Sequence, residues 1–478
     1  MSCGPQLVLA NSDLSRLSGI NPNAYSCCHQ LNTQYPNGDI RLDIDGLDCV
    51  TFGQISGLSR DLMDIAFYVY SADKRIRRST DADIYAARWI REITMVMSVR
   101  EMAVWQDQAV RSALEELLGF LTGDRWTLVF TTLPDMSYRP ILEFTGGKSF
   151  PGADSVCLFS GGMDSATGAI DAVLGSKLKP VLIGHRAAPV IGRRQRVLIN
   201  AIRDKYSQVW GFPFVSVRST QRGESVERTQ RSRSFLYLAL AVALAEGLEL
   251  ETVLCPENGI VSINLPLVGQ ISTMATRTTH PKTIALLRSL LERIYSKPPR
   301  LINPFALKTK GDLAEMMKGY DCSDIAVAST SCARTTFRTK DKPHCGICTQ
   351  CIERRFAFAY AGLEDEEPVQ SYEVDIFTEA LREGEARGNA EGYLRLITSL
   401  RSMTASDFYA KYGIAMLAVD EMDMEPRTAE RKLFEMAKSN ANQSLQALAT
   451  KSKGHMRDMQ LGQIPSSSLL GMARYGLR

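Results

Sequence analysis

The sequence predicts an α/β protein built around a parallel sheet. After Pro151 and Gly152, short apolar segments alternate with longer helical ones, which is the pattern of repeated strand–helix–strand units. With 478 residues, the chain exceeds what one hydrophobic core usually serves, so two or three domains are expected. A hydrophobic fraction of 45% with 23% charged residues is typical of a packed globular protein and excludes a disordered or collagen-like chain.

In the predicted parallel-sheet region, strands and helices alternate along the chain. The expected strands are 155–159, 180–184, 214–217 and 252–256, and the expected helices are 165–174, 193–210 and 233–246. Each helix is long enough to cross the face of a sheet and return the chain to a parallel neighbour. The order therefore predicts a sheet flanked by helices.

The regions on either side of this sheet differ from it in pattern. Before residue 150, alternating segments predict strands and 3.6-residue periodicity predicts helices, which together indicate an α+β extension: strands 39–45 and 126–132, helices 59–70 and 107–121. After Gly362, an acidic run at 364–367 resembles a linker to a mostly helical region, broken late at 465–468. We expect three domains: 1–150, 151–362 and 363–478.

Charge and hydropathy exclude some classes of protein. The formal net charge is only +3, so no strong global attraction to nucleic acid is expected, although 186–233 and 427–478 are locally basic and leave nucleic-acid binding open. The longest uncharged apolar run, 235–245, is far shorter than the roughly 20 residues needed to cross a bilayer. The first ten residues lack the pattern of a secretory signal. These features predict a cytoplasmic protein with no membrane partner.

A serine- and glycine-rich turn follows the first strand of the parallel sheet. It opens the next predicted helix and reads Ser160-Gly161-Gly162-Met163-Asp164-Ser165. Adjacent glycines let the backbone approach an anion, and amides at the helix amino terminus point toward it. Both serines can donate hydrogen bonds to the same oxygens, while Asp164 can bind magnesium or cap the helix. The turn therefore predicts a phosphate site, with pyrophosphate as the expected group.

Four of the eleven cysteines form a cluster in the sequence: Cys332, Cys345, Cys348 and Cys351. Two short turns and one longer loop at this spacing can close a tetrahedron of thiolates around zinc. Four thiolates leave no open coordination position, so the expected zinc is structural. His344 could replace a cysteine, but four thiols suffice. The other seven cysteines are expected to be buried small apolar groups.

These motifs resemble those of known enzymes. The turn resembles the loop of the PP-loop ATP pyrophosphatases, which form adenylates. The segment 344–355, with Cys332 upstream, is similar to the zinc segment of the 7-cyano-7-deazaguanine synthase family (QueC). Arg231-Ser232-Arg233-Ser234 is similar to that family's Gly-Arg-Asn, and 304–312 resembles its Pro-Leu-x-x-Leu-Thr-Lys-x-Glu. The resemblance covers about 153–362, less than half of the chain.

The resemblance implies ATP, Mg²⁺ and Zn²⁺ as cofactors and assigns roles to individual residues. The β- and γ-phosphates would be held by Ser160, Gly161, Gly162, Asp164 and Ser165. Asp164, Arg233 and Lys310 would be the catalytic residues, the two cations neutralising charge around ATP or the adenylate. The four clustered cysteines would hold the zinc.

The chain departs from the family where its members carry an Asp-Cys-Arg substrate segment. Here the sequence reads Glu257-Asn258-Gly259, so Glu257 and Asn258 become the candidate substrate-binding residues. They could bind a guanine-like edge, but a turn with helix-capping groups fits nearly as well. His185, at the end of a predicted strand, is more often a structural residue, although ligands bind at that edge of such sheets.

The added length before and after the matched region resembles the long QueC-like proteins of bacterial anti-phage operons, the Qat systems and type IV CBASS. This resemblance implies an ATP-dependent ligase that activates 7-carboxy-7-deazaguanine and attaches it to an amine, including an amine on a partner protein. Housekeeping nitrile synthesis for queuosine precursors is the alternative. A tRNA thiolase would need a pair of catalytic cysteines outside the zinc site, and only Cys255 is expected near the sheet edge. A nucleotide-binding module without catalysis also stays open.

Overall fold

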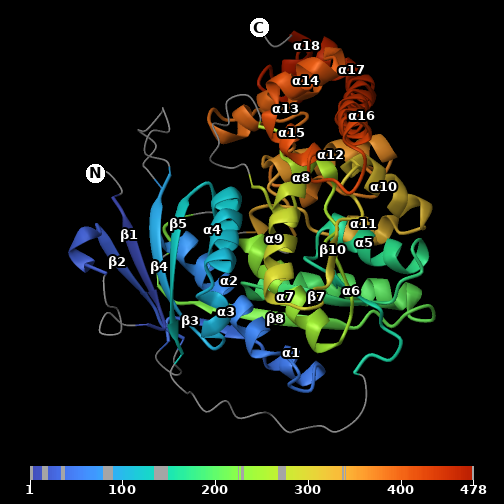
Figure 1. Ribbon diagram of the computed structural model, residues 1–478. Coiled ribbons are helices and arrows are strands. Elements are labelled where there is room, and N and C mark those ends of the chain that lie inside the picture. Colours follow the sequence, from blue (N-terminus) through green and yellow to red (C-terminus); the bar gives the residue numbers. More distant parts are fainter. Residues whose placement is uncertain are drawn as a thin grey trace.

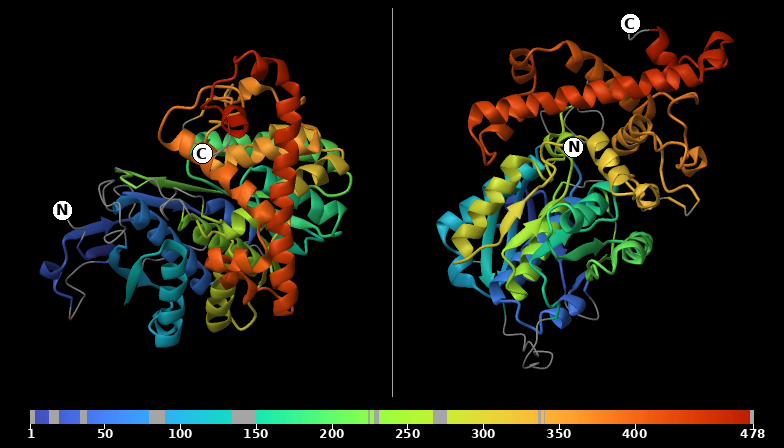
Figure 2. Two further views of the ribbon diagram at one scale, coloured as in Figure 1. Left: turned by 90° about the horizontal axis from the view of Figure 1, so that it is seen from above. Right: turned by 90° about the vertical axis from the view of Figure 1, so that its right-hand side faces the viewer.

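The computed structural model describes residues 4–12, 20–33, 38–78, 90–133, 149–223, 225–227, 231–266, 276–335, 338–339 and 341–475. These residues form two β-sheets and a helical carboxy-terminal region (Figure 1). The smaller sheet lies at the amino-terminal end of the chain and the larger sheet lies beside it. In Figure 2, the long helix α16 (Pro426–Gly454) runs across one end of the molecule.

The six-stranded sheet confirms the predicted α/β class. In spatial order its strands are β10 (Arg300–Ile302), β9 (Thr252–Leu254), β6 (Ser155–Leu158), β7 (Pro180–Arg186), β8 (Phe214–Gln221) and β3 (Ile40–Asp43). All neighbours pair in parallel except β3, which is antiparallel to β8. The connecting helices are α5 (Met163–Leu174), α6 (Pro189–Tyr206), α7 (Arg233–Gly247), α8 (Gly259–Ile263) and α9 (Pro281–Ile294).

The boundaries of α6 differ from the expected helix 193–210. The helix begins four residues earlier because Pro189 occupies its first turn, where a missing amide hydrogen costs nothing. It ends at Tyr206. Residues 207–209 form a turn, and Phe212, just beyond the expected helix, has a φ of +43°, a left-handed conformation unsuited to an α-helix.

The amino-terminal sheet corrects the expectation of an α+β extension. Its four strands pair in parallel in the order β2 (Cys27–Leu31), β1 (Gln6–Ala10), β4 (Glu92–Val99) and β5 (Arg125–Thr132). The helices of this region are α1 (Asp45–Val50), α2 (Gly57–Arg75), α3 (Met102–Trp105) and α4 (Gln108–Thr122), with a 3₁₀ turn at Pro22–Ala24. Because β1 and β4 were missed in the sequence, the parallel β4–α4–β5 unit could not be foreseen, and the region is α/β.

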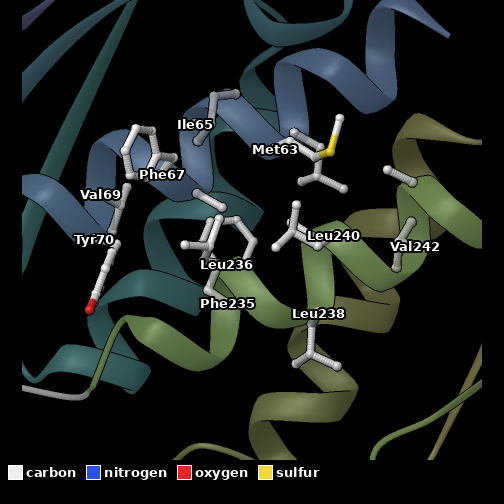
Figure 3. Close-up of a cluster of buried hydrophobic side chains, with 14 of the residues drawn as sticks. Met63, Ile65, Phe67, Val69, Tyr70, Phe235, Leu236, Leu238, Leu240 and Val242 are labelled. Carbon is white, nitrogen blue, oxygen red and sulfur yellow. The ribbon is translucent and has the colours of Figure 1, made fainter. Parts of the chain in front are cut away.

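Two elements from before residue 150 are built into the larger sheet and its helices. Strand β3, within the predicted strand 39–45, closes the edge of the six-stranded sheet. Helix α2 packs against α7, with Met63 and Phe67 facing Phe235 and Leu240 (Figure 3). Helix α7 is apolar on all sides because it lies between α2 and the sheet, as expected of a buried helix.

The carboxy-terminal region is helical, as predicted. The helices that lead into it and form it are α10 (Lys310–Gly319), α11 (Ser323–Ala328), α12 (Thr349–Ala361), α13 (Glu385–Ser402), α14 (Ala405–Lys411), α15 (Gly413–Val419), α16, α17 (Met456–Gln460) and α18 (Leu469–Tyr475), with a 3₁₀ turn at Val369–Ser371. Helices α17 and α18 flank the predicted break at 465–468.

The acidic run 364–367 is not a free linker. Glu367 is buried, with its Oε1 accepting from Arg354 Nε at 2.8 Å, and Glu364 pairs with Lys451 of α16. A hydrophobic cluster also joins Ile352 and Phe356 of α12 to helices after residue 380. The division into 1–150, 151–362 and 363–478 stays a prediction, and packing crosses both of its boundaries. Among the described residues, no helix is both long and apolar enough to span a membrane.

Candidate functional site

The serine- and glycine-rich turn lies at the carboxyl end of β6. Strand β6 has β7 on one side and β9 on the other, so the chain winds away from it in both directions, and such a switch point is where ligands bind in open α/β sheets. Gly161 has a φ of +88°, and a Cβ there would lie 3.3 Å from Gln195 Cγ, so the position favours glycine. Gly162 precedes α5 without a side-chain cap, which leaves amides at the helix start for an anion.

The two serines of the turn hold it in shape. Ser160 Oγ accepts a hydrogen bond from the Gly162 amide at 3.3 Å and lies 3.2 Å from Ser165 Oγ. Ser165 Oγ donates to the Gly162 carbonyl at 2.9 Å. The turn is therefore ordered by its own groups, and its two hydroxyls converge on one place.

Asp164, in the first turn of α5, forms a buried ion pair with Lys310, the first residue of α10. Its Oδ1 lies 3.2 Å from Lys310 Nζ, and its Oδ2 accepts from the Asn258 amide at 3.0 Å and from Asn258 Nδ2 at 2.6 Å. Burial raises the pKa of Asp164, but the charge of Lys310 and the hydrogen bonds from Asn258 outweigh it and lower the pKa below its ordinary value. The carboxylate is ionised at neutral pH.

Glu257 and Asn258, the candidate substrate residues, lie beside this pair but differ in surroundings. Asn258 is fully buried, and its Oδ1 caps α8 by accepting from the Val261 amide at 3.1 Å. Its amide group is committed to Asp164, which favours the helix-capping interpretation. Glu257 is half-buried, and its Oε2 accepts from Thr278 Oγ1 at 2.6 Å and from Thr279. Burial raises the pKa of Glu257 more than these hydroxyls lower it.

Arg233, the third candidate catalytic residue, contacts Tyr237 one turn further along α7. Its guanidinium carbon lies 4.9 Å from the centroid of the Tyr237 ring, and it also donates to the Tyr237 hydroxyl. Tyr237 packs edge-on against His185 at the end of β7, with 5.4 Å between ring centroids. The structure thus brings Asp164 and Lys310 together and places Arg233 in a second group of residues around His185.

The four clustered cysteines converge as the spacing predicts. Their sulfur atoms all lie within 4.8 Å of one another, and Cys345 Sγ is 3.8 Å from Cys351 Sγ. A tetrahedral zinc with Zn–S bonds of about 2.3 Å separates its sulfurs by about 3.8 Å, so the geometry fits this ion. All four cysteines are buried, and backbone amides donate to Cys332 Sγ and Cys345 Sγ at 3.3 Å each, as expected around thiolates.

His344 and the cysteines outside the cluster lie in different environments from the four clustered cysteines. His344 is buried and stacks on Tyr372, with 4.8 Å between ring centroids. The expectation that the other cysteines are buried holds for three of them and is wrong for three exposed ones, Cys27, Cys28 and Cys49; Cys3 lies outside the described residues. Cys27 and Cys28 are exposed because they lie on β2, an edge strand of the amino-terminal sheet.

Helix α12, which starts at the cysteine cluster, contributes residues that sequence reasoning missed. Gln350 Oε1 accepts a hydrogen bond from Lys310 Nζ at 3.2 Å. Glu353 follows one turn later, and its negative charge helps to raise the pKa of Lys310 against the opposing effect of burial. Their three-residue spacing places both on one helix face. That spacing was the available signal, but only the fold shows that this face meets α10.

A second connection joins the cysteine cluster to the serine- and glycine-rich turn at 160–165. The Thr330 amide, two residues before Cys332, donates to the Gly161 carbonyl at 3.0 Å. The preceding loop is held by Arg354 of α12, whose guanidinium donates to Ser329 Oγ at 2.8 Å and to the Ala326 carbonyl at 2.9 Å. A metal held by the cysteines would therefore brace the turn from the side.

A parallel sheet with a glycine turn at its switch point and a nearby four-thiol cluster defines the class: an α/β protein with a candidate anion site and a candidate zinc centre. Compared with known proteins, the chain is 26% identical over 229 residues to the 7-cyano-7-deazaguanine synthase of Methanopyrus kandleri, covering 45% of this chain and 97% of that protein. This similarity supports a relationship to the QueC-like enzymes. No family model and no solved structure matches the chain.

Proposed function

We propose that the chain is an ATP-dependent ligase that activates the carboxylate of 7-carboxy-7-deazaguanine as an adenylate. The observation that carries the proposal is the glycine turn at the sheet's switch point, with the ionised Asp164 and Lys310 directly beside it. The distant similarity to a 7-cyano-7-deazaguanine synthase supports an ATP-utilising synthase related to deazaguanine.

In the first step, the substrate carboxylate attacks the α-phosphorus of ATP, forming the acyl adenylate and breaking the bond to pyrophosphate. The amides after Gly161 and the hydroxyls of Ser160 and Ser165 would hold the departing phosphates. Lys310 and Arg233 would offset the negative charge that develops on the leaving group. These groups are ordered before the ligand arrives, so little rearrangement opposes the reaction.

In the second step, an amine attacks the adenylate carbonyl, and the products are an amide, AMP and a proton. Glu257 is the candidate for orienting the deazapurine, because its carboxylate can accept from ring N–H and amino groups. Asn258 would act indirectly, by holding Asp164 in place. With ammonia as the amine, a second ATP can activate the amide oxygen with release of pyrophosphate, and loss of AMP and a proton then leaves a nitrile, which is the alternative housekeeping function.

Zinc and magnesium fit different places in this scheme. The four cysteines would hold zinc as a structural ion that fixes the start of α12. Asp164 is the candidate magnesium ligand, because among the described residues its Oδ1 contacts only Lys310 and a carboxylate oxygen can accept two hydrogen bonds. Bound magnesium would supply positive charge at the phosphates.

We also propose that the product is a conjugate with an amine on a partner protein, formed in the cytoplasm as part of anti-phage defence. The support is the resemblance to long QueC-like proteins and the large share of the chain outside the matched region. Mass spectrometry of partner proteins after incubation with the chain, ATP and 7-carboxy-7-deazaguanine tests this. An added deazaguanine mass on a polypeptide is the expected result, and a free nitrile as the sole product contradicts it.

Thiolation through Cys255 has little support. This thiol is buried, its Sγ donates to the Ile302 carbonyl at 3.2 Å, and burial together with the charge of Glu257 raises its pKa to about 12. A catalytic cysteine needs a low pKa to form the thiolate. A nucleotide-binding module without catalysis stays the competing hypothesis.

A pyrophosphate assay decides between catalysis and binding alone. Wild-type protein with ATP, magnesium and 7-carboxy-7-deazaguanine should release pyrophosphate and AMP in equal amounts. Asp164→Asn keeps the shape of the side chain but loses the charge, and we expect turnover to fall by at least about a hundredfold. Asp171→Asn, on the same helix, is the control and should keep its activity. Release of neither product by the wild type would reject the ligase.

A further inference from the structure

Helix α2, outside the predicted nucleotide-binding region, reaches the carboxyl end of β7. There its last turns meet the end of that strand and the start of α7. Five side chains form what we call the edge cluster: Tyr70 and Lys74 of α2, His185 of β7, and Arg233 and Tyr237 of α7. In Figure 3 the hydroxyl of Tyr70 points away from the apolar packing between the two helices.

The rings of the edge cluster surround the imidazole of His185. Tyr70 and Tyr237 both pack edge-on against it, with centroid separations of 6.2 Å and 5.4 Å. His185 is fully buried, and its Nε2 lies 2.7 Å from Ser219 Oγ. Its Nδ1 has no hydrogen-bond partner within the described ranges, which is costly for a buried polar atom.

Two cations of the edge cluster lie close together. Lys74 Nζ is 5.4 Å from the centroid of the Tyr70 ring, and both burial and the nearby Arg233 lower the pKa of Lys74. In the part of the chain that the structure describes, no carboxylate pairs with Lys74. The neighbouring Asp73 is occupied by Arg91.

The imidazole does not add to this charge. Burial, with the charges of Arg233 and Lys74, lowers the pKa of His185 to about 3, so the ring is neutral and can offer one hydrogen bond through Nδ1. Lys74 thus contributes a positive charge with no carboxylate partner among the described residues, and His185 contributes a buried polar atom without a hydrogen bond.

The edge cluster adjoins the glycine turn through Gln195 of α6. The Nε2 of this fully buried side chain donates to the Phe159 carbonyl at 3.2 Å, to the Ser160 carbonyl at 3.4 Å and to the His185 carbonyl at 3.5 Å. One amide therefore ties the end of β6 to the end of β7. Lys74, Arg233 and Tyr237 are only partly buried, so their side chains are open to a ligand.

We propose that Lys74 and Tyr70 of α2 bind an anionic group of the ligand at the glycine turn, so that the amino-terminal region completes the site. The anion is a phosphate of the nucleotide or the carboxylate of the deazapurine, which share the same chemistry toward a lysine. This inference rests on the proposed function for the identity of the ligands, but binding measurements test it without turnover.

The test compares Lys74→Met with a matched variant. Lys438 of α16 also follows an aromatic residue by four positions and lies 5.4 Å from its ring, but it lies outside the edge cluster, so Lys438→Met is the control. Isothermal titration of each protein with magnesium ATP and separately with 7-carboxy-7-deazaguanine gives two affinities. We expect Lys74→Met to weaken one of them by about ten- to a hundredfold, as removal of a charged partner does.

The weakened ligand identifies the anion: loss for ATP alone indicates a phosphate, and loss for the deazapurine alone indicates its carboxylate. Lys74→Arg should retain most of the affinity because the charge is kept, and it serves if the methionine variant does not fold. Unchanged affinities in Lys74→Met, or no binding of either ligand by the wild type, would overturn the inference. Normal binding of both with no pyrophosphate release would reject the ligase while leaving the edge cluster supported.

Discussion

His280 is a buried histidine at which three parts of the chain meet. Its ring packs against Phe120 of α4, with 5.4 Å between centroids, and its Nε2 lies 3.0 Å from the Ile414 carbonyl oxygen in α15. Its Nδ1 accepts from the Lys282 amide at 3.1 Å, capping α9. Because a carbonyl only accepts and an amide only donates, the proton is on Nε2 and the ring is neutral.

This environment makes stability depend on pH. Burial is the main cause that lowers the pKa of His280 to about 4, whereas the unfolded chain titrates near 6.5. Below pH 6.5 the unfolded state therefore binds the extra proton, and stability is lost as the pH falls toward 4. We expect His280→Asn to remove roughly 2 kcal/mol of the difference in unfolding free energy between pH 7 and pH 5.

Urea unfolding at the two pH values measures this difference. His455→Asn, at the end of α16, is the control and should keep the pH dependence of the wild type. An equal pH dependence in His280→Asn and in the wild type would contradict the assignment.

At the scale of elements, α12 links the cysteine cluster to the candidate site. The helix begins after Cys348 and carries Cys351 in its first turn, so a metal there fixes its start. Gln350 then contacts Lys310, and Arg354 holds the loop that bonds to Gly161. Helix α12 therefore braces the candidate site from the side of Lys310 and of the loop before Cys332.

Removing a zinc ligand should loosen the site. Cys348→Ser is expected to lose bound zinc and to expose the amides of the first turns of α12 to hydrogen exchange. The reason is that the ligands converge only in the folded state, so metal binding stabilises the local fold. Pyrophosphate release should fall in parallel. Mass spectrometry of exchanged peptides and elemental analysis check this.

Cys322→Ser is the matched control: this buried cysteine lies outside the cluster, and a serine hydroxyl can keep its contact with Tyr206. Full activity in Cys348→Ser without metal would show that α12 needs no zinc.

At the scale of the whole molecule, the amino-terminal region is packed into the larger sheet. It contributes β3 at the edge of that sheet and α2 against the apolar α7. Without them, the face of α7 that carries Leu236 and Leu240, both fully buried, would meet water. Exposed apolar patches of this kind promote association and loss of specific packing.

A chain shortened to residues 149–478 should therefore fail to fold cooperatively. We expect it to be insoluble, or to bind a hydrophobic dye and unfold without a clear transition, whereas the full chain should be soluble and unfold cooperatively. Solubility, dye binding and calorimetry check this. A soluble fragment with a sharp transition would instead support the predicted domain boundary near residue 150.

The glycine turn and the cysteine spacing are local patterns, and each alone predicted the feature now seen there. The conformation of a glycine turn and the ends of a helix depend mainly on neighbouring residues. The sequence therefore predicted the turn at Gly161 and the bounds of α7 to within one residue. Four cysteines at short spacing can converge without knowledge of the rest of the fold. The parallel sheet followed from alternating periodicity.

The sequence by itself determined the class of the central sheet, the position of its glycine turn and the metal-binding pattern, because those depend on short-range chemistry. Only the tertiary structure decided that the amino-terminal sheet is parallel, that Asn258 holds Asp164, and that Lys74 lies near His185 at the end of β7. These contacts join residues about a hundred positions apart. They arise from burying α2 against α7, and α12 against α10 and α16, which no local pattern records.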